Sequence, residues 1–330
     1  MSAARRAGAT TFTRLALAAT AGVLALGLAE VLAWLIGLEP GFVRFSTADT
    51  PTRVVDGVLL WDHAQPRADA MDIQRAADPM PFTIVGLGDS IMYGVTLPKD
   101  ATYLEQARRA LALRNQPITV LNLAVPGYNT AQENAAYGEV AGRIRPDLVV
   151  LHYWEDDARQ YGVIAGHVVD TDDITVDQGR VVVRALPLPP SLSDFLLVHS
   201  RLYGLLTRAV ASRHGATAAD PQRVLAPLAA IDERVRRSGA RLVILASPEL
   251  NPSGIAPNND LPMLRQFAAA HGDEVIDLAE WLPAVDSKQI ALDGCHFNAE
   301  GHRLIGQGLA TYLLGHDLRA VPAAGAATAQ

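Results

Sequence analysis

The sequence predicts an α/β protein with a parallel sheet covered on both faces, preceded by an N-terminal transmembrane helix. Two observations predict this class. From residue 82 onward, short runs that are apolar throughout alternate with segments of helical spacing, which is typical of parallel strands buried on both faces. Before them, residues 15–38 form an apolar run with a single charge, Glu30. As a helix this run would be about 36 Å long, enough to cross a bilayer core of about 30 Å.

The amino-acid composition excludes several classes of protein. Of the 330 residues, 49% are hydrophobic and 19% charged, which excludes global disorder and allows a large core. The net charge of −7 argues against binding of nucleic acid by phosphate neutralisation. The single cysteine, Cys295, excludes a disulfide framework and a cysteine-rich metal site.

The N-terminal region predicts the compartment. Arginines precede the apolar run, so residues 1–14 are expected to be a cytoplasmic tail and residues 15–38 a single-pass anchor in the cell membrane. The main domain, which follows the anchor, would then be periplasmic or extracellular. We expect Glu30 to snorkel or to be protonated in the outer half of the membrane. A cleaved signal peptide is the alternative, but no A-x-A site closes the run, which favours an uncleaved signal-anchor.

The remaining elements follow in order. Residues 39–80 are interrupted by prolines and are interpreted as a juxtamembrane connector with one short strand within 54–61. The expected strands are residues 82–87, 118–124, 148–152, 241–246 and 275–278, and the expected helices are residues 102–113, 131–144, 224–238, 261–271 and 299–314.

Residues 158–223 interrupt the alternation as a long insertion after the third strand. Within it we predict a hairpin whose turn spans residues 177–180 and an amphipathic helix at 193–211. The insertion either shapes the binding cleft or is a structural elaboration or a spacer near the anchor. The main domain is expected at residues 81–315, and residues 316–330 are expected to be a disordered tail.

A candidate nucleophile follows the first strand, where the sequence reads Gly-Asp-Ser and ends at Ser90. Ligands of open α/β sheets bind outside the carboxyl ends of the strands, which places Ser90 where a nucleophile would act. The tripeptide alone is more often a turn, and Met92 stands where the G-x-S-x-G elbow has its second glycine.

A candidate base and its partner lie before the last helix. Asp293 and His296 are three residues apart in one tight turn, so their side chains can meet, and Asn298 can cap the helix that follows. A serine nucleophile needs such a base, oriented by an acid. The alternative is that Asp293 only initiates a turn and His296 is a surface histidine.

Two further loops follow strands of the predicted sheet. Gly127 follows a proline at a turn and offers an unobstructed backbone N–H, as an oxyanion hole requires, although alone it is an ordinary turn. The third strand ends in three consecutive acids, Glu155, Asp156 and Asp157, which could also be a solvated loop.

In this combination and order, the motifs resemble those of the SGNH (GDSL-type) hydrolase family over about residues 82–315. With the anchor and insertion, the chain looks like a membrane-anchored bacterial branch. The resemblance implies a flavodoxin-like, three-layer α/β/α fold and ester hydrolysis without a cofactor. It implies that Ser90 is the nucleophile, His296 the general base and acid, and Asp293 its orienting partner. The N–H groups of Ser90 and Gly127 would be the oxyanion donors.

One position departs from the family pattern. The family's third block supplies an asparagine N–H₂ to the oxyanion, and the matching position here is Asp156. An ionised carboxylate only accepts hydrogen bonds and would repel the oxyanion. Three explanations stay open: Asp156 is held protonated, another group such as the Trp154 indole N–H replaces it, or the site is impaired.

We therefore predict a membrane-anchored serine esterase or deacylase that needs neither metal nor cofactor and works through an acyl-serine intermediate. Candidate substrates are O-acyl groups on exported glycans. The alternatives are an acyltransferase that uses the same three residues, and a catalytically impaired protein that binds a ligand or assists envelope assembly.

Overall fold

The computed structural model describes residues 3–38, 43–46, 52–54, 59, 61–63, 65–159, 161–164, 167–170, 175–177, 180–182, 188–213, 221–282 and 286–316. The chain forms two compact units. The first unit comprises Met1–Thr50 and Gln160–Ala218, and the second comprises Pro51–Arg159 and Ala219–Gln330.

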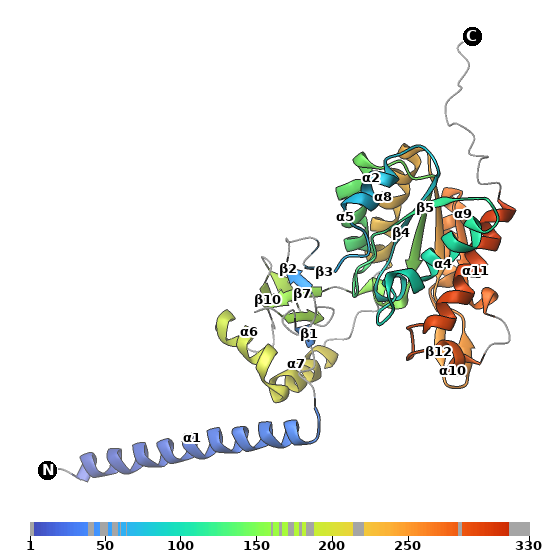
Figure 1. Ribbon diagram of the computed structural model, residues 1–330. Coiled ribbons are helices and arrows are strands. Elements are labelled where there is room, and N and C mark those ends of the chain that lie inside the picture. Colours follow the sequence, from blue (N-terminus) through green and yellow to red (C-terminus); the bar gives the residue numbers. More distant parts are fainter. Residues whose placement is uncertain are drawn as a thin grey trace. The chain divides into compact units, whose positions relative to one another are not determined.

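The second unit is built on a five-stranded sheet in which all neighbouring strands are parallel (Figure 1). Its order is β14-β11-β6-β4-β5, which in chain order is the flavodoxin-like 2-1-3-4-5 arrangement. The strands are β4 (Phe82–Leu87), β5 (Ile118–Asn122), β6 (Leu148–Tyr153), β11 (Arg241–Ala246) and β14 (Glu274–Asp277). The predicted α/β class with a parallel sheet is therefore confirmed.

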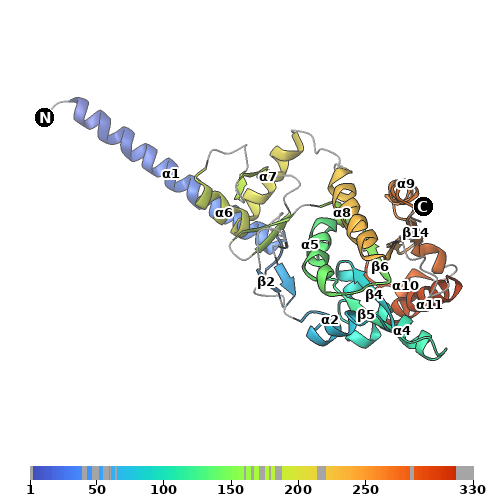
Figure 2. The same ribbon diagram turned by 90° about the horizontal axis from the view of Figure 1, so that it is seen from above.

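Both faces of this sheet are buried, because successive side chains of a strand point to opposite faces. Ile84 and Val150 pack into one core, and Val85 and Val149 pack into the other. Helices α4 (Tyr103–Ala112) and α11 (Ala299–Gly315) line the first core, whereas the second is lined by α2 (Ala70–Ala76), α5 (Thr130–Val140), α8 (Gln222–Ser238) and α9 (Leu261–His271). The view from above shows α5 and α8 side by side (Figure 2).

Shorter elements connect these layers. They are β2 (Thr52–Val54), β3 (Trp61–His63), α3 (Ser90–Tyr93), η1 (Lys99–Ala101), η2 (Ala141–Arg143), η3 (Glu155–Ala158), β12 (Glu249–Asn251), β13 (Gly254–Ala256), η4 (Leu278–Trp281) and α10 (Ser287–Ile290).

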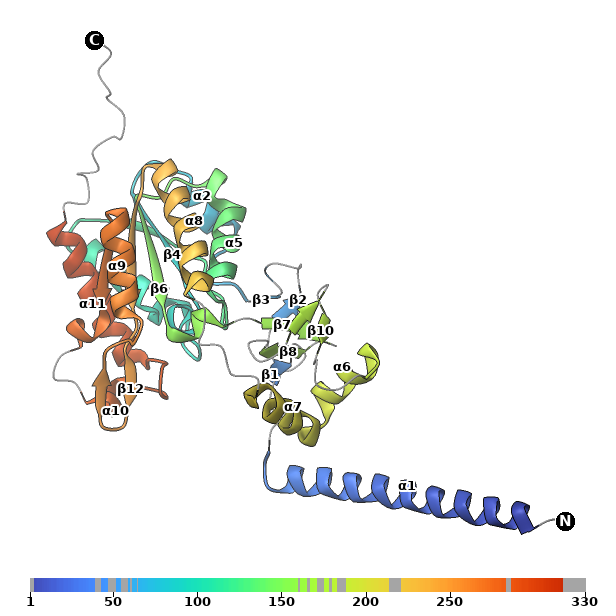
Figure 3. The same ribbon diagram turned by 180° about the vertical axis from the view of Figure 1, so that it is seen from behind.

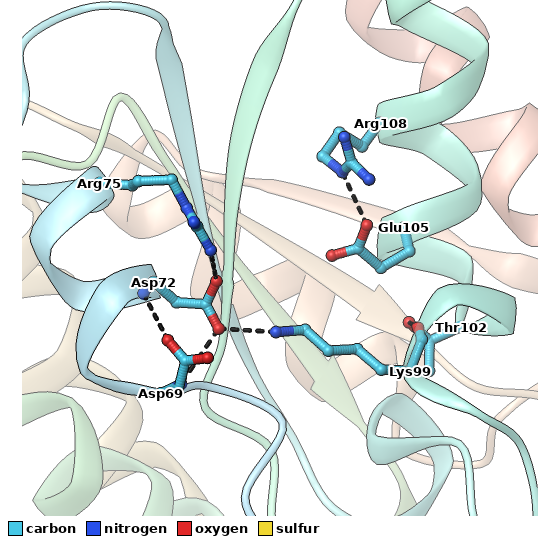
Figure 4. Close-up of polar contacts among 7 residues, drawn as sticks. All are labelled: Asp69, Asp72, Arg75, Lys99, Thr102, Glu105 and Arg108. Atoms are coloured by element: carbon cyan, nitrogen blue, oxygen red, sulfur yellow. Dashed lines mark hydrogen bonds and ion pairs between the residues drawn. The ribbon is translucent and has the colours of Figure 1, made fainter.

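An ion-pair cluster ties α2 to η1 (Figure 4). Asp69 and Asp72 form a capping box at the start of α2. The buried Asp72 carboxylate also accepts a hydrogen bond from Lys99 Nζ at 2.6 Å and pairs with Arg75. Burial raises the pKa of Asp72, but the hydrogen bonds from Lys99, the Asp69 backbone and Arg75 outweigh it, so the pKa is lowered. The cluster therefore holds α2 against η1 as an ionised network.

The first unit contains the long N-terminal helix α1 (Ala3–Leu35). Within it, Thr13–Leu35 is long and apolar enough to cross a membrane, with a mean hydropathy of 2.1. The unit also holds the antiparallel sheet β1-β8-β7, formed by β1 (Val43–Ser46), β7 (Tyr161–Ile164) and β8 (His167–Asp170), and the helices α6 (Pro190–His199) and α7 (Arg201–Arg213). The hairpin predicted in the insertion is confirmed: β9 (Thr175–Asp177) pairs with β10 (Arg180–Val182), and Asp177 faces Arg180.

Two predicted elements were wrong in detail. The single helix expected at 193–211 is two helices, because Ser200 has an extended backbone (φ −108°, ψ 118°) and its Oγ accepts a hydrogen bond from Tyr203 N at the start of α7. The single strand expected within 54–61 is instead a pair, β2 and β3, in which Val54 faces Trp61. Of the disordered tail expected at residues 316–330, residues 317–330 lie outside the described residues.

Candidate active site

Ser90 lies at the carboxyl end of β4, an inner strand between β5 and β6, and is the first residue of α3. The segment packs closely against its neighbours, because a Cβ at Gly88 would lie 2.8 Å from Met92 Cβ and 3.2 Å from His152 Cβ, which leaves room only for glycine. Asp89 Oδ1 accepts a hydrogen bond from Ile91 N at 2.8 Å and so caps α3. Ser90 itself is half-buried, so its hydroxyl is held by a rigid element yet reachable.

The loop between α10 and α11 carries Asp293 and His296. Leu292 N donates to His296 O at 2.8 Å, which closes the loop on itself. One carboxylate oxygen of Asp293, Oδ1, accepts from the backbone N–H groups of Cys295 and His296, at 3.0 and 2.8 Å. Two residues later, Asn298 Oδ1 caps α11 by accepting from Glu300 N and Gly301 N. The loop is therefore rigid on both sides of the imidazole.

The structure brings these three side chains, distant in sequence, into one line. Ser90 Oγ lies 2.7 Å from His296 Nε2, and His296 Nδ1 lies 2.8 Å from Asp293 Oδ2. A carboxylate only accepts hydrogen bonds, so Nδ1 carries the proton and Nε2 is left to accept from the serine hydroxyl. This arrangement can remove a proton from Ser90 Oγ when the oxygen attacks an electrophile.

The charge on Asp293 is stabilised by its hydrogen bonds. Partial burial alone would raise the pKa of Asp293. The backbone N–H groups of His296 and Cys295 and the His296 side chain outweigh that burial and lower the pKa to about 2. Cys295 Sγ lies 3.5 Å from both His296 Nδ1 and Asp293 Oδ1, so the thiol packs against the pair.

Gly127 lies in the loop after β5, which runs beside the loop that carries Ser90. Val125 N donates a hydrogen bond to Gly88 O at 3.1 Å. Gly127 follows Val125 by two residues, and Ser90 follows Gly88 by two residues. Gly127 has a φ of 82°, a conformation that favours glycine. Its N–H and the first N–H of α3, that of Ser90, are therefore carried by two neighbouring loops at this edge of the sheet.

Asp156 lies in η3, directly after β6 and at the same edge of the sheet. Its side chain falls outside the described part of the chain, so its predicted place at the oxyanion stays a prediction. The neighbouring Asp157 is buried, and its Oδ2 accepts a hydrogen bond from Trp154 N at 3.0 Å.

The sequence motifs indicate no role for several buried polar groups near Ser90. Glu133, in the first turn of α5, is 1% exposed, and neither of its carboxyl oxygens has a hydrogen-bond partner among the described residues. Burial, and then the charge of Asp89, raises the pKa of Glu133 well above its usual range, which favours the neutral acid. Only its place in the stretch around Gly127 could have drawn attention to it.

Two further histidines pack around Tyr103, which is fully buried. Tyr103 Oη lies 2.9 Å from His152 Nδ1, and Tyr103 N donates to His302 Nδ1 at 3.1 Å. Burial lowers the pKa of His152 to about 3, and burial together with Arg67 and His296 lowers that of His302 to about 4. Both imidazoles are therefore neutral, and the ring of His302 stacks on that of Tyr103.

Among the described residues, two groups offer metal-ligand atoms within 4.8 Å of one another. One is Asp293, Cys295 and His296, whose imidazole is already paired with the carboxylate. The other is Asp232, His271 and Asp273. It lies beside the first residues of β11 and β14, opposite the strand ends that carry Ser90. There Asp232 already binds Arg236 Nε at 2.7 Å and His271 Nδ1 at 2.8 Å.

The sheet is flavodoxin-like, and a serine, an imidazole and a carboxylate are aligned at its carboxyl edge. Together these features define the class of serine hydrolases without a G-x-S-x-G elbow. The model of the GDSL-like lipase/acylhydrolase family matches residues 87–304, and the chain belongs to this family. It is accordingly a carboxylic ester hydrolase.

The chain is also similar to solved structures. An acetyl xylan esterase is 13% identical with a TM-score of 0.44, over 70% of this chain and 100% of that one. The lipase/acylhydrolase from Enterococcus faecalis is 16% identical with a TM-score of 0.43, over 72% and 97%. The esterase EstA from Pseudoalteromonas sp. is 11% identical with a TM-score of 0.46, over 72% and 98%. A search of curated protein sequences found no significant match.

Proposed function

We propose that Ser90, His296 and Asp293 form the catalytic triad of a membrane-anchored esterase. The observation that carries this proposal is the continuous hydrogen-bonded line from Ser90 Oγ through His296 to Asp293 Oδ2, at 2.7 and 2.8 Å. As Oγ attacks the ester carbonyl carbon, its proton passes to His296 Nε2, and Asp293 stabilises the imidazolium.

The tetrahedral intermediate then collapses. The bond to the alcohol oxygen breaks, Nε2 returns its proton to that alcohol, and an acyl-Ser90 ester is left. Water attacks this ester with the same base, and the acid is released. The N–H groups of Ser90 and Gly127 would donate to the oxyanion in both steps.

We further propose that α1 anchors the enzyme in the cell membrane, with residues 1–14 in the cytoplasm and the hydrolase on the periplasmic or extracellular side. The apolar stretch Thr13–Leu35 and the arginines before it support this topology. Substrates on that side include exported glycans, so we propose their O-acyl groups as the natural esters. Acetate release from an O-acetylated polysaccharide would support hydrolysis, whereas transfer of the acetyl group to an added glycan would favour an acyltransferase.

Turnover of p-nitrophenyl acetate by the full-length protein in detergent tests the catalytic proposal. Ser90→Ala should lower kcat by more than about 10⁴-fold, because the acyl acceptor is lost. Ser253→Ala is the matched control, since Ser253 is an exposed turn residue between β12 and β13, and it should leave kcat unchanged. Turnover that survives Ser90→Ala would refute the assigned nucleophile.

A further inference from the structure

Helix α7 lies beside the C-terminal part of α1, and α6 contacts α7 (Figures 1 and 3). The only acidic residue of α1, Glu30, makes the attachment. Its carboxylate accepts hydrogen bonds from Ser200 Oγ at 2.9 Å, Arg201 N at 2.6 Å and Leu202 N at 3.2 Å. Glu30 thus caps the N-terminus of α7, where helices favour a negative charge.

A second contact fixes the same junction beyond the end of α1. Arg201 Nε donates to Leu38 O at 2.6 Å, and its guanidinium lies 3.9 Å from Glu30 Oε1. Ala33, between these two attachment points, is 3% exposed, whereas Leu32 and Trp34 beside it are 52% and 60% exposed. One stripe of α1 is therefore covered by protein at this level, and the rest of its circumference is open.

The attachment lies within the apolar stretch and not after it. The stretch ends at Leu35, and Glu30 precedes that end by roughly 7–8 Å at the rise of an α-helix. If Thr13–Leu35 spans the bilayer, the start of α7 is held at or below the level where the hydrocarbon meets the headgroups. Helices held there contact lipid and not only water.

The surfaces of α6 and α7 match that position. Four large apolar side chains are exposed although the helices belong to a folded unit: Leu192 (43%), Phe195 (58%), Leu205 (43%) and Leu206 (47%). Leu197, Val198 and Tyr203 of the same helices are buried, so the exposed set is not simply an unpacked core. The sequence of α7 has three arginines and no acid, a composition that suits anionic headgroups.

We propose that α6 and α7 are interfacial helices whose apolar side chains insert into the membrane leaflet around the C-terminal end of α1. The occupant of this surface is a phospholipid bilayer. This inference rests on the proposed membrane anchor and adds to it a second contact with the membrane. The enzyme is then attached to the membrane by the transmembrane span and by a helical platform, which consists of α6 and α7, and not by a flexible tether alone.

Depth-dependent quenching of an environment-sensitive fluorophore tests the platform. The full-length protein carries Cys295→Ala and one new cysteine for labelling: Phe195→Cys or Leu206→Cys on the platform, Leu26→Cys in the span, or Leu113→Cys in the second unit. Leu113 is the matched control, an apolar residue that is 88% exposed. The labelled proteins are reconstituted into phosphatidylcholine–phosphatidylglycerol vesicles with lipids spin-labelled near the headgroup or deep in the chain, and a far-UV circular dichroism spectrum equal to that of the wild type verifies folding.

The labels at Phe195→Cys and Leu206→Cys should emit at shorter wavelength than the Leu113 label. They should also lose at least about half of their fluorescence to the shallow quencher, because interfacial helices lie about 5–10 Å into the headgroup–acyl boundary. The Leu26 label should be quenched more by the deep spin label, and the Leu113 label by neither. Glu30→Ala should reduce the quenching at Leu206→Cys, because the cap that holds α7 at this depth is lost, and should leave the Leu26 label unchanged.

Different failures have different meanings. Quenching at Leu26 without quenching at Phe195 and Leu206 would overturn the platform and leave the anchor intact. Labels at Phe195 and Leu206 that emit at short wavelength but resist lipid quenchers would mean that protein, such as a second copy of the chain, covers the surface, which also overturns the proposal. Absence of quenching at Leu26 would refute the anchor, and the platform with it.

Discussion

The side chain of Asp293 is 55% exposed, whereas that of His296 is 22% exposed. Water screens an exposed charge, so the electrostatic effect of this carboxylate on the imidazole is weaker than that of a buried one. The carboxylate of Asp293 is instead held in a fixed orientation. Two backbone N–H groups bind one of its oxygens, and the imidazole Nδ1 binds the other. We infer that its main role is to hold the tautomer of His296.

Asp293→Asn tests this role. An asparagine can keep the loop contacts through its carbonyl oxygen but can turn its NH₂ toward Nδ1, which would leave the proton on Nε2, where it cannot accept from Ser90. We expect kcat to fall by about 10⁴-fold, as expected for the wrong tautomer in a serine triad. Esterase kinetics measure the effect, and Asp286→Asn is the control, because Asp286 is an exposed N-cap of α10 that asparagine can replace. Equal activity of both variants would contradict the assignment.

Asp156→Asn addresses the departure from the family pattern. If Asp156 stands where the family has an oxyanion donor, an amide N–H₂ replaces a charge that opposes the developing oxyanion. We expect kcat/KM for p-nitrophenyl acetate to rise by about 10²–10³-fold, the contribution of one such donor. A fall in kcat/KM would mean that the carboxyl group already serves the wild-type enzyme, as a protonated donor or as an acceptor.

At the scale of elements, the helix α11 and the loop before it act together. Asn298 caps α11 through Oδ1, and its Nδ2 donates to Gln289 O at 2.9 Å, so one side chain joins α10, the His296 loop and α11. Loss of this side chain should loosen the loop that positions the imidazole.

Asn298→Ala should lower the free energy of unfolding by about 0.5–2 kcal/mol, the usual contribution of an N-cap. Because the imidazole is then less well positioned, kcat should also fall, whereas Asn298→Ser, which keeps a capping oxygen, should restore most of the stability. Urea unfolding and esterase kinetics measure the two effects. Unchanged stability in the alanine variant would show that water replaces the cap.

The elements of the second unit were predictable because their signals are local. A strand buried on both faces is apolar along its whole length, and the helices between such strands carry an apolar stripe. The break at Ser200 was not predictable, because part of the capping at the start of α7 comes from Glu30, which is 170 residues away from Ser200 in the sequence. The split of the strand expected at 54–61 likewise depends on the pairing of Val54 with Trp61.

The residues of the candidate site were likewise predictable only where their signal in the sequence is local. Ser90, Asp293 and His296 lie in short motifs whose residue types are informative by themselves, so the sequence points to them directly. Glu133 could not be distinguished from a solvent-facing helical acid, because its burial arises from the packing of α5 on the sheet. Sequence patterns report the chemistry of a loop, but not which charged side chain the fold encloses.

At the scale of the whole molecule, the buried neutral histidines make stability depend on pH. The pKa of His302 is about 4 in the folded protein and about 6.5 when unfolded. Above about pH 6.5 both states are neutral, and the contribution of His302 to stability is fully present. As the pH falls toward 4 the unfolded state binds the proton first, so this contribution is lost at up to about 1.4 kcal/mol per pH unit.

His302→Asn isolates this effect, because asparagine can still accept the hydrogen bond from Tyr103 N but does not titrate. The stability advantage of the wild type over the variant should shrink by about 2 kcal/mol between pH 7 and pH 5. Urea unfolding followed by tryptophan fluorescence at the two pH values measures it. A constant difference between the two proteins would mean that His302 is protonated equally in both states.

The most direct test of the proposed catalytic site is intact-mass spectrometry of the full-length protein after reaction with a fluorophosphonate, followed by mapping of the modified peptide. The reagent forms a stable bond only with a hydroxyl that a neighbouring base activates. We predict one adduct, on Ser90, that is absent from Ser90→Ala and formed much more slowly in His296→Ala. No adduct on the folded wild-type protein, or an adduct on another residue that persists in Ser90→Ala, would contradict the account.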